Sequence, residues 1–436
     1  MENRLYSLLE RLFRLSEYGA RVRTEVLAGV TTFVTMAYII FVNPQIMADA
    51  GMDPGAGFVV TCLASALACL LMGFYANWPV GLAPGMGMNA FFSYTVVGSM
   101  GYSWQIALGA VFLSGALFFL ISVTRLRHWL LSSIPMNLRF AMGSGVGLFI
   151  GFIGLQNGGI IVDSPVTILT LGDLTRPETM LAAIGFLLIA GLSVRGVPGA
   201  ILLGILAVTL IGLIAGLVSY QGLVSAPPDM AATFLQLDVT GALDAAMVSV
   251  IMAFLFVNLF DTTGTLMGVA QRAGLVDDQG NIRNMDRALK SDSSANVVGA
   301  CLGCTPVTSY VESVAGITSG GRTGLTAVTV GILFLLAVFF APLARMVPEF
   351  ATSGAIVYVA MLMLGGMRDL DWDDASELVP ALITIVAIPL TFSIADGIAI
   401  GFITYTCIKL AVGQFREISA GVWVLTLIFL AKFIFL

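Results

Sequence analysis

Apolar stretches that are long enough to cross a lipid bilayer recur along almost the whole chain. They begin at Val26 and continue to the C-terminus, and a helix of about 20 such residues spans a bilayer. Charged residues make up only 11% of the 436 positions, compared with about 25% in soluble domains. The connections are too short for a soluble domain, and no basic cluster of the kind that binds nucleic acid is present. The sequence therefore predicts an all-α polytopic membrane protein embedded in a bilayer.

Fourteen transmembrane segments are expected from these stretches. They cover residues 26–49, 56–76, 84–98, 103–123, 136–155, 179–194, 198–218, 245–270, 291–303, 306–317, 325–346, 352–367, 377–394 and 395–412. A further apolar stretch at 420–436 is interpreted either as an extra span or as a helix in the membrane interface.

Lys and Arg residues are concentrated in alternate connections, as the positive-inside rule requires of cytoplasmic loops. The outer connection 220–244 has none, and Arg176 and Arg345 are the exceptions. Both ends of the fourteen-span region are therefore expected to be cytoplasmic, in a cell inner (plasma) membrane. Residues 1–23 carry five arginines among Leu, Tyr and Phe, which predicts a cytoplasmic amphipathic helix rather than a signal peptide.

Two segments in opposite halves of the chain share an interrupted pattern. Gly81–Phe92 reads GLAPGMGMNAFF and Gly303–Val314 reads GCTPVTSYVESV, with Pro84 and Pro306 separated by 222 positions. Two halves of seven spans each must insert in opposite orientations. Inverted repeats with matching Gly/Pro breaks indicate a secondary transporter whose site lies near the midplane. We therefore expect broken half-helices at spans 3 and 10.

Three polar residues in these apolar surroundings are candidates for the site. Glu312 and Asp261 are acids at membrane depth, where ionisable groups are costly and mark functional sites by default. Two roles are open for each acid. It either binds ligand and undergoes reversible protonation, or it is a buried acid held by backbone donors. Asn89 either contacts the ligand or caps the half-helix after Pro84. Asn43 precedes Pro44, where a cap or turn is expected.

Other chemistries find little support in the residues. The pair Cys301 and Cys304 has CxxC spacing but lacks a second Cys or His cluster, so no metal site is expected. The single histidine, His128, lies in a cytoplasmic loop, which excludes histidine proton relays. No nucleophile and base arrangement indicates an enzyme, and no phosphate loop or cofactor motif is evident.

Four motifs resemble those of the AzgA-like purine permeases, a branch of the nucleobase-ascorbate transporter superfamily that includes the bacterial uracil transporter. They read VNPQIMADAGMD, GLAPGMGMNAFFSY, LFDTTGTLMGVAQRAGLVD and SDSSANVVGACLGCTPVTSYVESVAGITSGGRTGLTA. The resemblance implies a fourteen-helix inverted-repeat fold with short strands before half-helices 3 and 10. One departure is Asn258, where relatives often carry Asp.

The resemblance also implies a division into a core domain and a gate domain. The expected order is a cytoplasmic N-terminus (1–25), core (26–125), gate (126–219), an outer loop (220–244), core (245–346), gate (347–413) and a C-terminal apolar segment (414–436). A homodimer formed through the gate is common in the superfamily.

Proton-coupled import of adenine, guanine or hypoxanthine is the activity that the resemblance implies. In the AzgA-like permeases, the polar residues that matter lie in spans 3, 8 and 10. The resemblance matches them to Asn89, Asp261 and Glu312 of this chain. We hypothesise that Glu312 binds the base and that Asp261 or Glu312 carries the proton, Na⁺ being the less favoured coupling ion. Further substrate contacts are expected from Thr262, Thr308, Ser309 and Tyr310. The alternatives are a transporter of anions or of uracil or xanthine with the same fold, and a receptor without coupling.

Overall fold

The structure, a computed structural model, describes residues 2–124, 133–277 and 281–435, most of them in helices. The first half contains α1 (Glu2–Phe13), α2 (Val22–Met36), α3 (Ile39–Asp49), α4 (Pro54–Leu71), η1 (Met72–Ala76), β1 (Leu82–Pro84), α5 (Met86–Ala90), η2 (Phe91–Ser99), α6 (Trp104–Val123), α8 (Met136–Asn157), β2 (Ile161–Ser164), β3 (Ile168–Leu171), α9 (Pro177–Val194) and α10 (Ala200–Ile214). Arg125, Arg127 and His128 lie outside the described residues.

The second half repeats the alternation of long and short helices. It contains η3 (Gly241–Leu243), α11 (Ala245–Ala273), α12 (Met285–Leu302), β4 (Val307–Ser309), α13 (Ser313–Thr318), α14 (Gly324–Ala337), η4 (Val338–Phe340), α15 (Ala341–Met346), α16 (Glu349–Met363), η5 (Leu364–Asp369), α17 (Ala375–Thr391), α18 (Ile394–Ala411), η6 (Phe415–Glu417) and α19 (Ala420–Phe435).

By length and composition, nine helical segments in the described part of the chain could cross a membrane. Shorter apolar helices lie at 200–214, 375–391 and 420–434. The last of these, α19, packs on α18 through Phe402 and Phe429. The helices therefore establish a multi-pass membrane protein, whereas the fourteen-span inverted repeat stays a prediction.

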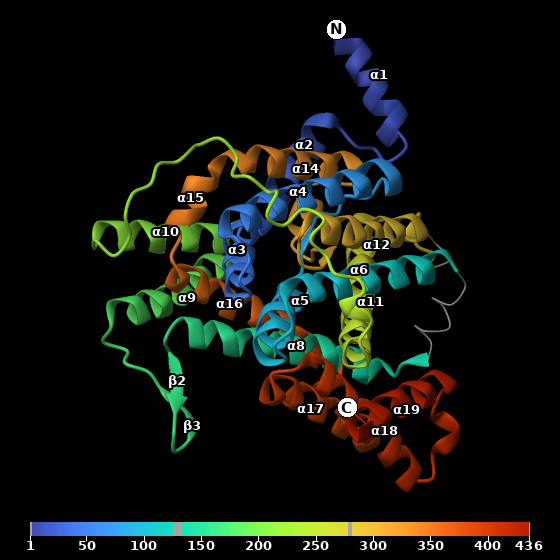
Figure 1. Cartoon of the computed structure of the whole chain (residues 1–436). Coiled ribbons are helices and arrows are strands. Elements are labelled where there is room, and N and C mark those ends of the chain that lie inside the picture. The colour runs from blue at the N-terminus through green and yellow to red at the C-terminus, as the bar shows by residue number, and fades with distance from the viewer. Residues whose placement is uncertain (1, 125–132, 278–280, 436) are drawn as a thin grey trace.

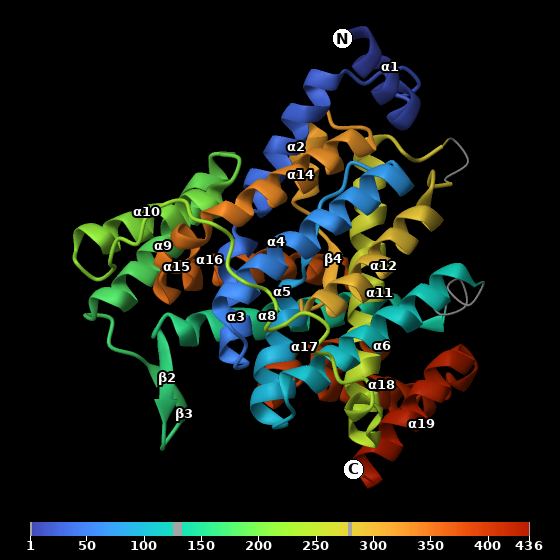
Figure 2. The ribbon, with the colours of Figure 1, turned by 45° about the horizontal axis from the view of Figure 1, so that its top comes forward.

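The helices pack as two groups, each of which combines both halves of the chain. In one group α14 lies against α2 and α4, and α12 lies against α6; Figures 1 and 2 show orange α14 beside blue α2 and α4. In the other group α8 contacts α16 and α17, while α9 and α10 contact α16. The assignment of these groups to a core domain and a gate domain stays a prediction.

The two interrupted segments meet in the centre of the molecule. Strands β1 and β4 pair antiparallel, with Leu82 opposite Ser309 and Pro84 opposite Val307. Each strand leads into a short helix, α5 and η2 after β1 and α13 after β4. The pairing satisfies backbone groups that water cannot reach at membrane depth.

Three local features differ from the sequence expectations. The first span is divided into α2 and α3 by a turn at Ala37 and Tyr38. The ninth begins at Met285 rather than Ser291, which places Asp292 well inside α12. Residues 161–171 of the connection after α8 form a β-hairpin.

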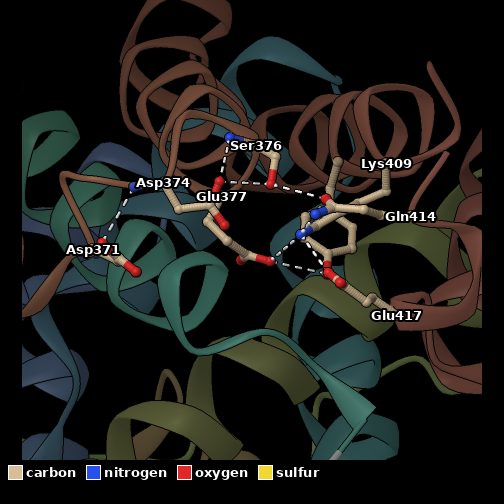
Figure 3. Close-up of polar contacts among 8 residues, drawn as sticks. Asp371, Asp374, Ser376, Glu377, Lys409, Gln414 and Glu417 are labelled. Atoms are coloured by element: carbon tan, nitrogen blue, oxygen red, sulfur yellow. Dashed lines mark hydrogen bonds and ion pairs between the residues drawn. The ribbon is translucent and has the colours of Figure 1, made fainter. Parts of the chain in front are cut away.

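A buried lysine joins the cytoplasmic ends expected for α17 and α18 (Figure 3). The Lys409 Nζ lies 3.0 Å from Glu377 Oε1 and 2.8 Å from Glu417 Oε2. It also donates to Gln414 Oε1 at 3.2 Å. At the start of α17 the hydroxyl of Ser376 donates to Asp374 and holds the pKa of that carboxyl below its usual range. The cluster connects α17, α18 and the segment before α19.

Lys409→Met is expected to destabilise the protein by about 3 kcal/mol, the low end of the range for a broken buried pair, because it leaves Glu377, which is 21% exposed, without its buried counter-ion. The matched control is Lys432→Met, since Lys432 pairs with Asp396 in a more solvated position and such pairs contribute at most about 1 kcal/mol. Thermal unfolding of the purified protein in detergent measures both variants. Equal decreases in melting temperature would contradict a special role for Lys409.

Candidate functional site

A cavity of about 520 Å³ lies beside the paired strands, between the two helix groups. This volume is within the range of small-molecule sites, roughly 300 to 1,000 Å³. Its wall combines α5, β4, the turn before α13 and α11 from one group with α8, α16 and η5 from the other. Most of the wall is apolar, and Asp261 and Glu312 are the acids that line it. The cavity therefore brings together two carboxylates that lie 51 positions apart in the sequence.

Glu312 stands in the turn between β4 and α13 and is partly exposed to the cavity. Its Oε1 accepts a hydrogen bond from the hydroxyl of Tyr38 at 2.8 Å. Tyr38, in the turn between α2 and α3, is itself buried, with its ring 6.5 Å from that of Tyr310. The first span thus fixes the orientation of the Glu312 carboxylate.

Asp261 lies in the middle of α11 with its side chain exposed to the cavity. The Thr308 hydroxyl on β4 is 3.4 Å from Asp261 Oδ2 and 3.0 Å from the hydroxyl of Thr262. Thr262 is fully buried and lies behind the cavity wall. A row of hydroxyl groups therefore leads from Asp261 into the protein.

That row ends at Asp292 on α12, an acid that sequence reasoning missed. Asp292 Oδ1 accepts from Thr262 at 3.0 Å, and its Oδ2 accepts from Ser309 at 2.7 Å. The residue is completely buried. In the sequence, Asp292 was visible only as an acid at the edge of the expected ninth span. The start of that span was predicted at Ser291, six residues after the observed start of α12 at Met285.

Backbone groups next to β4 are already hydrogen-bonded to the other interrupted segment. The amide of Tyr310 donates to Gly81 O at 3.0 Å, and the amide of Gly85 donates to Pro306 O at 2.8 Å. The Tyr310 hydroxyl donates to Pro84 O. These groups hold the two interrupted segments together in this conformation, so the side chains of Thr308 and Glu312 are the polar groups best placed for a ligand.

Asn89 is buried in α5 and lies outside the cavity wall. Its Nδ2 donates to Asn43 Oδ1 at 2.8 Å, which also accepts from Thr305 at 3.0 Å. The Oδ1 atom of Asn89 has no hydrogen-bond partner among the described residues. Asn43 is inside α3 rather than in the expected cap or turn, and its Nδ2 donates to Thr61 at 2.8 Å.

Arg139 on α8 also lines the cavity, as a cation in the same wall as the two acids. Its guanidinium lies 5.6 Å from the ring centroid of Phe260 and donates to Ile134 O. Met136 and Met267, which are 56% and 47% exposed, mark the mouth of the cavity. These ends of α8 and α11 adjoin the connections rich in Lys and Arg.

Of the seven predicted substrate-binding residues, five line one cavity and two lie behind it. The five are Asp261, Thr308, Ser309, Tyr310 and Glu312, and the two are Asn89 and Thr262. Contact with a ligand stays a prediction for all seven.

Comparison with known sequences identifies the family. A family model described as "Permease family" (Xan_ur_permease) matches residues 23–400. The adenine permease AdeP of Escherichia coli K12 is 47% identical, with 98% of this chain and 96% of that protein aligned. The guanine/hypoxanthine permease PbuG of Bacillus subtilis 168 is 41% identical, with 98% of this chain and all of that protein aligned.

Solved transporter structures share the fold. The transmembrane domain of the cyanobacterial bicarbonate transporter BicA superposes with a TM-score of 0.64 at 16% identity, covering 86% of this chain and 96% of that one. Murine Slc26a9, an anion transporter in its inward-facing state, gives 0.64 at 10% identity, covering 94% and 72%. The family indicates a transporter rather than an enzyme. The chain belongs to the permease family that the Xan_ur_permease model describes, within its AzgA-like purine permeases.

Proposed function

We propose that this chain is a proton-coupled purine nucleobase symporter that imports adenine, guanine or hypoxanthine by alternating access. The observation that carries the proposal is that Asp261 and Glu312 line one apolar cavity next to the paired interrupted segments. The aligned relatives named as purine permeases support the substrate class.

A purine base matches this cavity chemically. Its ring N–H and amino groups are donors, and a carboxylate is an acceptor whose hydrogen bonds are stronger than those between neutral groups. Glu312 would accept from the base while Tyr38 holds its other contact. The apolar wall, which includes Val146 and Val359, would cover the faces of the ring.

We assign the proton to Asp261. Its side chain is exposed to the cavity, where water can reach it, and it contacts Thr308 on the strand that leads to Glu312. The hydroxyl row through Thr262 ends at the buried Asp292. A proton on Asp261 removes one of two negative charges in the cavity, so binding of proton and base favour each other.

Transport then requires the core (26–125 and 245–346) to move against the gate (126–219 and 347–413). The cavity mouth adjoins the basic connections, so this conformation would face the cytoplasm. The proposal includes a cytoplasmic amphipathic N-terminus and fourteen spans, arranged as inverted seven-helix repeats, in the cell's inner membrane. A homodimer would use the gate surface.

An anion transporter of the same fold is the alternative that Arg139 favours, because a guanidinium lines the cavity. Two carboxylates in the same wall oppose it, since each like charge disfavours a bound anion. Purine transport is therefore the better reading of the cavity.

Uptake of radiolabelled adenine, hypoxanthine, guanine and uracil, with and without a protonophore, tests the proposal. At least one purine is expected to accumulate in cells that express the chain, and the protonophore is expected to abolish accumulation. Cells with the empty vector are the control. Purine uptake that follows Na⁺ and ignores the protonophore would contradict proton coupling, and accumulation of uracil alone would contradict the substrate class.

A further inference from the structure

A second cavity of about 230 Å³ lies along α3 and beside the start of α16, the helix whose other end lines the central cavity. Helix α3 passes from Tyr38, just before its start, to Asp49, and α16 begins at Glu349 beside the second cavity and ends near the central one. By the distribution of Lys and Arg, this end faces outward. The function proposed above does not use this cavity.

The second cavity has the construction of a small-molecule site. Its inner walls are apolar and include the buried Phe41 and Phe58. Asp49, Arg345 and Glu349 are exposed at its mouth, so both signs of charge are present and neither kind of ion is clearly selected. An uncharged polar molecule with flat apolar faces suits such a site. The volume, less than half that of the central cavity, is below the range of drug-sized sites and limits the occupant to a molecule no larger than a single bicyclic base.

Gln45 provides the amide of this cavity. In α3, it belongs to the VNPQIMADAGMD motif. Its Nε2 donates to Val347 O at 2.9 Å, and its Oε1 accepts from the hydroxyl of Thr352 at 2.5 Å. Thr352 lies in the first turn of α16 and Val347 lies just before that helix, both in the expected gate. The amide therefore holds core and gate together at the end away from the open mouth.

We propose that this outer cavity is a second subsite for a purine nucleobase, recognised by the Gln45 amide. A Gln amide offers one donor and one acceptor side by side, the pattern that pairs with the N6 and N7 edge of adenine and with similar purine edges. When the gate moves away from α3, the amide loses Val347 and Thr352 as partners, and a base edge replaces them. Base binding thus competes with the closed contact and favours outward opening.

Because this proposal rests on purine transport, its test separates the two sites. Equilibrium binding of the tritiated base that the uptake assay identifies is measured on purified full-length protein. The wild type is expected to bind two bases per chain. A chain with Asp261→Asn and Glu312→Gln, which lacks the central site, is expected to bind one. Adding Gln45→Leu is expected to weaken this remaining binding about tenfold or more, the effect of losing a bidentate pair.

Two further variants control for folding. Gln236→Leu makes the same change in the exposed outer loop and is expected to leave binding unchanged. Gln45→Glu keeps the acceptor but loses the donor, so it is also expected to weaken binding while preserving size. One base per wild-type chain and none in the double variant would overturn the outer subsite and leave purine transport standing. Residual binding that ignores Gln45 would also overturn it, whereas a wild type without purine uptake would refute the proposed function itself.

Discussion

Glu312→Gln is expected to reduce purine uptake by about 10- to 100-fold. The substitution keeps the size of the side chain but removes its charge, and a hydrogen bond to a charged group contributes about 1.5 to 3 kcal/mol. The Tyr38 hydroxyl still has an acceptor in the amide oxygen, so folding is expected to change little. Initial uptake rates and equilibrium binding of the base measure the effect.

Asp261→Asn separates proton coupling from base binding. An amide imitates the protonated acid permanently, so exchange of labelled for unlabelled base across the membrane is expected to continue. Accumulation driven by a proton gradient is expected to be lost. Glu178→Gln, at an exposed position in the first turn of α9, is the neutral control. Loss of exchange in Asp261→Asn together with its retention in Glu312→Gln would reverse the two assignments.

Gly87→Ala is expected to have a large effect for a steric reason. A Cβ at Gly87 in α5 would lie 2.0 Å from Val146 Cγ1 in α8, a contact that no packing tolerates without movement. Because α5 and α8 belong to the two groups that move against each other in the proposed transport cycle, the strain would act at that interface. Overpacking costs about 1 to 3 kcal/mol, so uptake is expected to decrease about tenfold or more.

Val146→Ala provides the rescue that identifies the cause. It removes the Cγ atoms of Val146, and the next nearest atoms to the new Cβ, Val146 Cβ and Ile150 Cδ1, lie at 3.5 Å, an ordinary contact. The double variant is therefore expected to recover most of the uptake. If it is as inactive as Gly87→Ala alone, the added methyl group acts elsewhere.

The sequence predicted the structural features that the bilayer imposes on the chain. Stretches of the right length must be helices in lipid, and a helix or short helix lies at each expected span. Asp261 and Glu312 stood out because an acid in such a stretch is costly, and both line the cavity. Pro84 and Pro306 marked the breaks because proline removes a backbone donor.

What the sequence did not predict depends on contacts between distant segments. Asp292 follows a stretch, 285–290, whose three charged residues placed it outside the expected span, and packing against Thr262 and Ser309 buries Asp292. Asn43 precedes a proline that suggests a turn, yet α3 continues through Pro44. Arg139 reaches the cavity because α8 packs beside α11, which no local pattern indicates.

The pairing of β1 with β4 has a consequence for biosynthesis. Leu82 emerges from the ribosome long before its partner Ser309, and until then the backbone groups of β1 have no strand to bond. Exposed peptide groups are costly in lipid, so the first half must wait in an incompletely folded form until the second half is inserted. The centre is therefore completed late, and substitutions in either strand are expected to expose the nascent protein to membrane proteases.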